Sequence, residues 1–211
     1  MFGKKIDWGF EMTVQVFSVL SILFYLTALL MFFRVHTLDS SVSIICDPVS
    51  NYGVGKTAVF FRRYGYCGTV AAACLAVSFL MSHSPVFPNE VLIGMVLLPI
   101  LRIGVIGFKT DIQVDSFAHS SAEGKWHLLF AIVSFAAMYT VITNATPLMT
   151  SDSDWLLAGL SILKNTAKFS LIGVIFAMIK PLKMIFGIFE RVFLLSTLLW
   201  FVLANIWFLL K

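Results

Sequence analysis

Charge and cysteine are both scarce in this chain of 211 residues. Only 12% of the residues are charged, whereas soluble domains carry roughly 25%, and 59% are hydrophobic. So little charge does not cover a water-exposed surface of this size, which excludes an ordinary soluble domain. The three cysteines are an odd set without metal spacing. The basic residues form no cluster interleaved with aromatics, so we expect no nucleic-acid partner.

Long apolar runs take the place of the missing charge. Runs near the roughly 20 residues that cross a bilayer recur along the chain. We therefore expect an all-α membrane protein, with residues 1–211 forming a single integral membrane domain. The predicted fold is a bundle of six transmembrane helices with a capping loop after the first. The expected spans are Thr13–Phe33, Arg63–Met81, Val91–Phe108, His127–Thr143, Ser161–Ile179 and Phe189–Leu210.

The ends and faces of these spans follow from local composition. Arg34 is expected to end the first span, and the loop from Val35 to Arg63 is too apolar to be disordered, which indicates a cap folded onto the bundle. Gly68 and neighbouring alanines give the second span a small-residue face, on which we expect the third span to pack closely. Residues Trp155–Leu160 are predicted to be an interfacial entry to the fifth span.

The basic residues favour one orientation. Six spans place the loops one-two, three-four and five-six on one surface, which then carries nine basic residues: Arg34, Lys56, Arg62, Arg63, Lys109, Lys125, Lys180, Lys183 and Arg191. The opposite surface carries five: Lys4, Lys5, Lys164, Lys168 and Lys211. The positive-inside rule therefore predicts that the three loops are cytoplasmic. We expect an integral membrane protein of the bacterial inner (plasma) membrane.

Four polar clusters share the surface with the larger basic count. They are residues 47–53, 109–111, 124–127 and 190–191. An arginine, Arg102, lies within the third span near this surface. Arginine inside a span usually faces the bundle and has a partner, and we expect that partner to be Asp111 or, second, Glu190. One alternative is an anion clamp, because arginine recognises phosphate and carboxylate bidentately. The other is an arginine that snorkels to the interface without a partner.

Three residues are candidates for catalysis. His127 opens the fourth span and suits proton transfer, with Asp111 as the residue that orients it and Ser50 as a nucleophile. The alternative for His127 is a histidine that is hydrogen-bonded to a loop. The alternative for the Asp47-Pro-Val-Ser50 stretch is turn chemistry with helix capping. No GxSxG elbow is present. Arg102, Asp47, Glu190 and Arg191 are the predicted ligand-binding residues.

A metal site is the weaker interpretation of the same surface. His36, His119, Asp111 and Asp115 lie on it, but their spacing resembles no zinc motif such as HExxH. We expect no metal and no other cofactor.

Short motifs give the chain a family resemblance. They are Pro48-Val-Ser50-Asn-Tyr-Gly53, Phe108-Lys-Thr110-Asp111, Gly124-Lys-Trp-His127 and Glu190-Arg191. In this arrangement the chain resembles the domain-of-unknown-function 998 family of six-span integral membrane proteins. The family usually has an acidic residue where this chain has Asn51, and proline where it has Lys109. The resemblance implies a six-span fold and a polar motif set, without an established reaction.

Two functions of different classes fit these residues. In the first, a polar pocket at one membrane surface binds a lipid headgroup, and whether it also processes that headgroup is open. In the second, the protein is a non-catalytic accessory subunit of a larger membrane complex, and the polar residues tie helix ends together. The expected partners are membrane lipids and, in the second case, other membrane protein subunits.

Overall fold

Six long α-helices make up most of the described protein. The computed structural model describes residues 8–82, 86–112, 120–179 and 182–211. The helices are α1 (Trp8–Leu38), α2 (Ala58–Met81), α3 (Asn89–Gly107), α4 (Ala122–Ala145), α5 (Asp154–Ala177) and α6 (Phe186–Leu210). Each is long and apolar enough to cross a membrane, and the described residues contain no strand. The predicted all-α fold with six long apolar helices is confirmed.

Several helix boundaries differ from the prediction, and α2 and α4 begin at Ala58 and Ala122, before the expected Arg63 and His127. Helix α1 does not end at Arg34 but continues to Leu38, because Val35 is fully buried in the core while the arginine is exposed and reaches outward on its long stem. Helix α5 begins at Asp154, so residues Trp155–Leu160, expected as an interfacial entry to the fifth span, belong to one continuous helix with it. Leu156 and Leu160 are fully buried, and their packing continues the helix through that segment.

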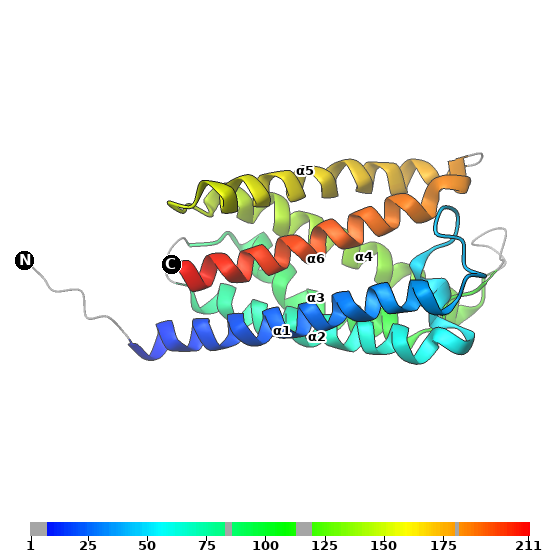
Figure 1. The fold of residues 1–211 in the computed structure, drawn as a ribbon, viewed down its shortest axis with the longest axis horizontal. Coiled ribbons are helices and arrows are strands. Elements are labelled where there is room, and N and C mark those ends of the chain that lie inside the picture. The colour runs from blue at the N-terminus through cyan, green and yellow to red at the C-terminus, as the bar shows by residue number, and fades with distance from the viewer. Residues whose placement is uncertain (1–7, 83–85, 113–119, 180–181) are drawn as a thin grey trace, which may run out of the picture.

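The helices run up and down, so three connections share one end of the bundle. Helix α1 begins and α6 ends at the left of Figure 1, and the connections α1–α2, α3–α4 and α5–α6 all lie at the right. We call this right-hand end the loop end. Neighbours in sequence are neighbours in space: α1 packs on α2, α2 on α3, α3 on α4 and α5 on α6, and α6 also contacts α1.

Helices α2 and α6 are the most buried. Small residues on α2 allow α3 to approach: a Cβ added to Gly65 would lie 2.5 Å from Ile106, and one added to Gly68 would lie 2.2 Å from the Arg102 guanidinium. The predicted close packing of these two helices through small residues is therefore confirmed. Such contacts hold helices together where the hydrophobic effect between them is weak.

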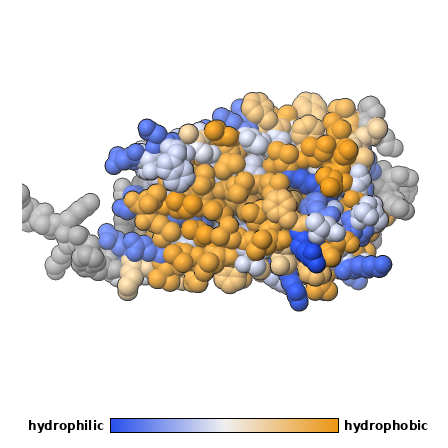
Figure 2. Space-filling view, viewed as in Figure 1, coloured by the Kyte–Doolittle hydropathy of each residue, from blue (hydrophilic) through white to orange (hydrophobic). Residues whose placement is uncertain are grey.

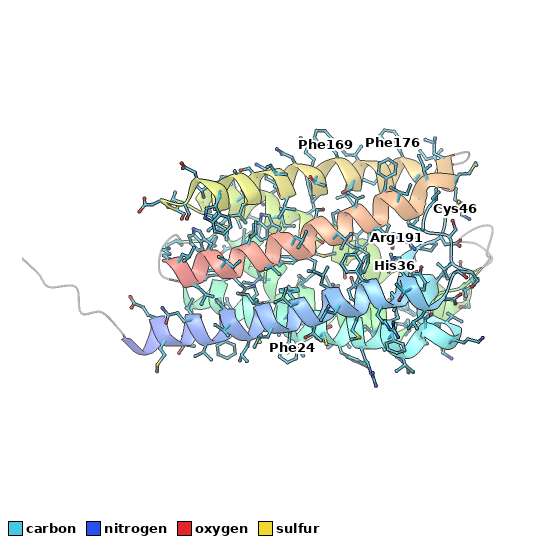
Figure 3. The ribbon with its side chains drawn as sticks, viewed as in Figure 1. Phe24, His36, Cys46, Phe169, Phe176 and Arg191 are labelled. Atoms are coloured by element: carbon cyan, nitrogen blue, oxygen red, sulfur yellow. The ribbon has the colours of Figure 1, made fainter. Side chains whose placement is uncertain are left out.

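The surface of the bundle has an apolar middle and polar ends. Figure 2 shows hydrophobic side chains as a broad band across one face, with hydrophilic side chains toward both ends. Phe24 on α1 and Phe169 and Phe176 on α5 point away from the bundle (Figure 3), and Phe169 and Phe176 are more than half exposed. This distribution is typical of a protein whose middle faces lipid.

The α1–α2 connection folds into the predicted cap. It contains two short 3₁₀ helices, η1 (Val49–Gly53) and η2 (Gly55–Thr57), which lie at the loop end (Figure 1). Val49 and Tyr52 of η1 are buried, and the Thr57 hydroxyl donates to the Tyr52 carbonyl at 2.9 Å. Gly55, with φ of 75°, takes the left-handed turn between the two helices that other residues rarely adopt.

Candidate functional site

A pocket of about 430 Å³ opens at the loop end, between the cap and the α2, α3 and α4 helix ends. Three segments form it: the cap with the first turns of α2, the last turn of α3 with the residues that follow it, and the second turn of α4. The lining residues are Ser50, Gly53, Val54, Gly55, Ala58, Phe61, Arg62, Val105, Ile106, Gly107, Phe108, Lys109, Thr110 and His127. We call this cavity the loop-end pocket.

The charged side chains around this pocket have one sign. Arg62 and Lys109 line it, both are exposed, and no carboxylate is among its described lining residues. The Ser50 hydroxyl donates to the Thr110 hydroxyl at 3.4 Å, a long bond that leaves both groups free to contact a ligand. Two cations with two hydroxyls favour an anionic ligand that carries several acceptor oxygens.

His127 forms the pocket's inner polar edge. It is 6% exposed, and its Nδ1 lies 3.0 Å from the Phe108 carbonyl. Because a carbonyl only accepts, Nδ1 carries the proton and donates, which satisfies a carbonyl left unpaired at the end of α3. Ser50 is hydrogen-bonded to Thr110 and not to His127, so no nucleophile–base pair is formed. The catalytic roles of these residues stay a prediction.

Asp111 contacts the start of α4 instead of His127 or Arg102. Its two carboxylate oxygens accept from the Ser121 amide at 2.7 Å and the Ser121 hydroxyl at 2.8 Å. The same hydroxyl accepts from the Gly124 amide at 3.0 Å, which is the usual N-cap bond of a helix. A Cβ on Gly124 would lie 2.1 Å from the carboxylate. Asp111 therefore extends the cap of α4.

Arg102 lies deeper in the bundle than the loop-end pocket. Its guanidinium lies over the Tyr64 ring at 5.6 Å and beside Gly68. The expected ion pair is not formed, because Asp111 contacts Ser121 and Glu190 contacts Val49. Among the residues that the structure describes, Arg102 has no carboxylate partner, and its buried Nε has no hydrogen-bond acceptor.

Glu190 and Asp47 belong to the attachment of the cap. The Glu190 carboxylate is 8% exposed and accepts from the Val49 amide at 2.6 Å. That amide is the first of η1, so α6 supplies the cap that η1 lacks. The Asp47 carboxylate accepts from the Ser43 amide at 2.7 Å, which closes the preceding turn, as the turn interpretation of this stretch predicts.

Arg191 joins the cap to both α6 and α1. Its Nη1 donates to the Asp47 carbonyl at 2.7 Å and to the Gly187 carbonyl at 3.0 Å, and its Nε donates to His36 Nε2 at 2.8 Å. Figure 3 shows Arg191 on α6 directed toward His36 on α1. The guanidinium also lies over the Tyr52 ring at 5.9 Å, within the range of a cation–π contact.

The bond from Arg191 assigns the protonation of His36. The His36 Nδ1 lies 2.6 Å from the Phe32 carbonyl and must donate to it, whereas Nε2 accepts from the arginine. The imidazole is therefore neutral. We call Asp47, Glu190, Arg191 and His36 the latch, because they fasten η1 to α6 and α1.

The glycine at the start of α6 makes this attachment close. A Cβ on Gly187 would lie 2.6 Å from the Asp47 carbonyl oxygen and 2.8 Å from that of Ile44. The Ile188 amide donates to the Ile45 carbonyl at 3.2 Å. The cap thus contacts α6 backbone to backbone. A substitution at Gly187 meets atoms that move only with the whole cap.

The predicted site residues therefore fall into separate places. Ser50 and His127 line the loop-end pocket, Asp111 caps α4, Arg102 lies in the interior, and the other three belong to the latch. Sequence reasoning missed Arg62, Lys109 and Thr110 as pocket residues and His36 as a latch residue. The prediction ended the first span at Arg34, so it placed His36 in the loop and not on the last turn of α1, where it faces Arg191. The basic residues were counted for orientation only.

Metal ligation has no support in the described parts of the chain. There, no three His, Cys, Asp or Glu residues are grouped so that they would hold an ion. His119 and Asp115, which sequence analysis placed near this surface, lie outside the described residues. Outside the pocket, Asp39 accepts from the Ser41 hydroxyl and amide, and these bonds lower its pKa below the usual value.

The described fold defines a class: an all-helical bundle with six candidate membrane spans and a capped loop end. No protein-family model matches the chain, and neither does a curated protein sequence or a solved structure. The resemblance to the domain-of-unknown-function 998 family stays a prediction. The evidence for a function therefore lies in the loop-end pocket and the latch.

Proposed function

We propose that the chain is an integral protein of the bacterial inner membrane that binds an anionic lipid headgroup in the loop-end pocket. One observation carries this proposal: the pocket of about 430 Å³ is lined by two cations, Arg62 and Lys109, and by no described carboxylate. It lies at the helix ends, where the headgroups of a surrounding bilayer would be. The basic count of the loop end favours the cytoplasmic leaflet.

The pocket offers matching contacts to both parts of such a ligand. A headgroup phosphate accepts from the Arg62 guanidinium and the Lys109 ammonium, and from the Ser50 and Thr110 hydroxyls. Phe61 and Ile106 line the pocket on its apolar side and contact the glycerol and the first methylenes. Binding is the proposed activity, because the Ser50 hydroxyl is bonded to Thr110 and to no base among the residues that the structure describes.

The accessory-subunit hypothesis is supported by the latch. Glu190 and Asp47 contact only backbone amides of the cap, and Arg191 contacts His36 and backbone carbonyls. These contacts tie helix ends together, as that hypothesis expects. They leave the loop-end pocket unexplained, so we rank lipid binding first.

Native mass spectrometry of the gently purified protein tests the proposal. We expect the wild-type protein to retain phosphatidylglycerol in preference to phosphatidylcholine when both are supplied in mixed micelles. The double variant Arg62→Gln/Lys109→Gln removes both pocket cations and should weaken retention about tenfold or more, because charge-assisted bonds are lost. The control Arg63→Gln/Lys183→Gln removes the same charge from the same end, at exposed residues outside the pocket, and should retain the lipid.

Two results would contradict the proposal. If both double variants lose phosphatidylglycerol equally, the lipid is held by the general charge of the loop end and not by the pocket. If a stoichiometric protein partner co-purifies instead and is unaffected by either double variant, the accessory-subunit hypothesis replaces lipid binding.

A further inference from the structure

Arg102 is half-buried in the bundle, and its Nε is buried without a hydrogen-bond partner among the described residues. The arginine side chain stays protonated in proteins, and burying a charge is costly unless a counter-charge or hydrogen bonds compensate it. Among the described residues no carboxylate contacts Arg102, and its Nε has no acceptor. The Tyr64 ring provides one weak compensation at 5.6 Å. Among the described residues, the buried part of this charge is therefore left without a counter-charge.

A small cavity lies against this arginine. Its volume is about 10 Å³, which is near the minimum that holds one water-sized particle. Five helices contribute to its wall: α1, α2, α3, α4 and α6. The lining residues are Tyr25, Tyr64, Gly68, Arg102, Met138, Leu194, Thr197, Leu198 and Phe201. We call it the interior cavity.

A second orphan group lies in the same wall. Tyr25 is 3% exposed, and its hydroxyl is buried without a hydrogen-bond partner. The Thr197 hydroxyl donates to the Leu194 carbonyl at 3.0 Å, so its proton is already used. Two unpaired donors, the Tyr25 hydroxyl and the Arg102 Nε–H, therefore border one cavity. Buried donors are rarely left without an acceptor in a native protein.

We propose that the interior cavity binds a monatomic anion, chloride in the cell, between Arg102 and the Tyr25 hydroxyl. An anion supplies what the described chain lacks at this place, namely a negative charge and an acceptor for both donors. The cavity size selects the ligand. A phosphate or carboxylate group does not fit in about 10 Å³, whereas chloride is only slightly larger than water. The apolar walls formed by Met138, Leu194 and Phe201 exclude a hydrated cation.

This anion site is separate from the loop-end pocket. The two cavities share no lining residue. Ile106, one turn beyond Arg102 on α3, lines the loop-end pocket and packs on Gly65, between the two sites. Loss of lipid binding therefore does not predict loss of anion binding, and each proposal stands without the other.

Thermal unfolding of the detergent-solubilised protein at constant ionic strength tests the site. Sodium gluconate is replaced stepwise by sodium chloride, and we expect the melting temperature to rise and to saturate, because a ligand that binds only the folded state stabilises it. Bromide should act like chloride. Tyr25→Phe removes only the hydroxyl and should raise the chloride concentration for half of the effect about tenfold. Arg102→Gln should abolish the chloride dependence.

Matched controls separate the site from general salt effects. Tyr66→Phe and Arg63→Gln change the same residue types at exposed positions and should keep the wild-type chloride dependence. Arg62→Gln/Lys109→Gln should keep it too. Chloride-35 NMR line broadening reports binding directly and should diminish in Tyr25→Phe, which keeps the measurement valid if Arg102→Gln does not fold. Equal melting in chloride and gluconate, or a Tyr25→Phe protein with the wild-type half-saturation, would show that the cavity holds water only and would overturn the proposal.

Discussion

The cap has two polar neighbourhoods that differ in what their polar atoms contact. On the latch side, Glu190 and Asp47 contact backbone amides, and Arg191 bonds to His36 and two carbonyls. On the pocket side, Arg62 and Lys109 are exposed around a cavity, and Ser50 makes one long bond. In the sequence, charged and hydrogen-bonding residues occur on both sides. The difference teaches that the contacts of a polar residue, and not its burial alone, distinguish the two neighbourhoods, since Asp47 and Ser50 are both half-buried.

The largest effect is expected at Arg191. Arg191→Leu removes three hydrogen bonds, so the His36 nitrogen, the part-buried Asp47 carbonyl and the buried Gly187 carbonyl lose this donor. We expect a loss of about 3 kcal/mol in the free energy of unfolding, measured by SDS titration in mixed micelles. Arg62→Leu, at an exposed position, should change that free energy by less than about 0.5 kcal/mol. Equal losses in the two variants would remove the distinction between latch and pocket.

A substitution at Gly187 tests the close contact between the cap and α6 without removing a hydrogen-bonding side chain. In Gly187→Ala the new Cβ meets the Asp47 and Ile44 carbonyl oxygens at 2.6 and 2.8 Å, so the cap must shift, at a cost of about 2 kcal/mol. Gly107→Ala is the matched control in α3, because a Cβ there has nothing within 4 Å. It should be neutral or slightly stabilising, since alanine favours helix. The same SDS titration measures both, and a neutral Gly187→Ala would mean that the cap is not held against α6.

A substitution at Asp111 tests whether this residue caps α4 or takes part in ligand binding. Asp111→Ala removes the bonds from the Ser121 amide and hydroxyl and should cost about 1 kcal/mol of unfolding free energy. Lipid retention in native mass spectrometry should stay at the wild-type level, because the carboxylate does not line the pocket. Loss of lipid without loss of stability would instead assign Asp111 to the ligand.

The smallest effect on stability is expected at Ser50. Its hydroxyl makes only the 3.4 Å bond to Thr110, so Ser50→Ala should change the free energy of unfolding by less than about 0.5 kcal/mol. Retention of phosphatidylglycerol should fall severalfold, because one donor to the phosphate is lost. Thr37→Ala is a control on an exposed hydroxyl of α1 and should change neither quantity. A large destabilisation by Ser50→Ala would place this residue with the latch.

The sequence by itself determined the number of long helices, their approximate positions and the cap. These features are local, because the length of an apolar run and the turn residues around Pro48 act over a few neighbours. The small-residue packing of α2 on α3 was also predictable, since the glycines and alanines of α2 form a local pattern, and a Cβ at position 68 would lie 2.2 Å from the Arg102 guanidinium. The last turn of α1 and the beginning of α5 were not predictable from local patterns, because buried Val35 and Leu156 extend these helices by contacts with other elements.

Only the tertiary structure decided what each polar residue contacts. Glu190 caps an amide 141 residues away, and Arg191 bonds to a histidine 155 residues away. Such bonds depend on how α1, the cap and α6 pack, which no local pattern encodes. Ser50 and Asp47, three residues apart, have different surroundings for the same reason: the short helix η1 lies between α6 and the pocket. Packing thus gave two polar residues of one motif different contacts although both are half-buried, because the element that lies against each side of η1 decides which partners are within reach.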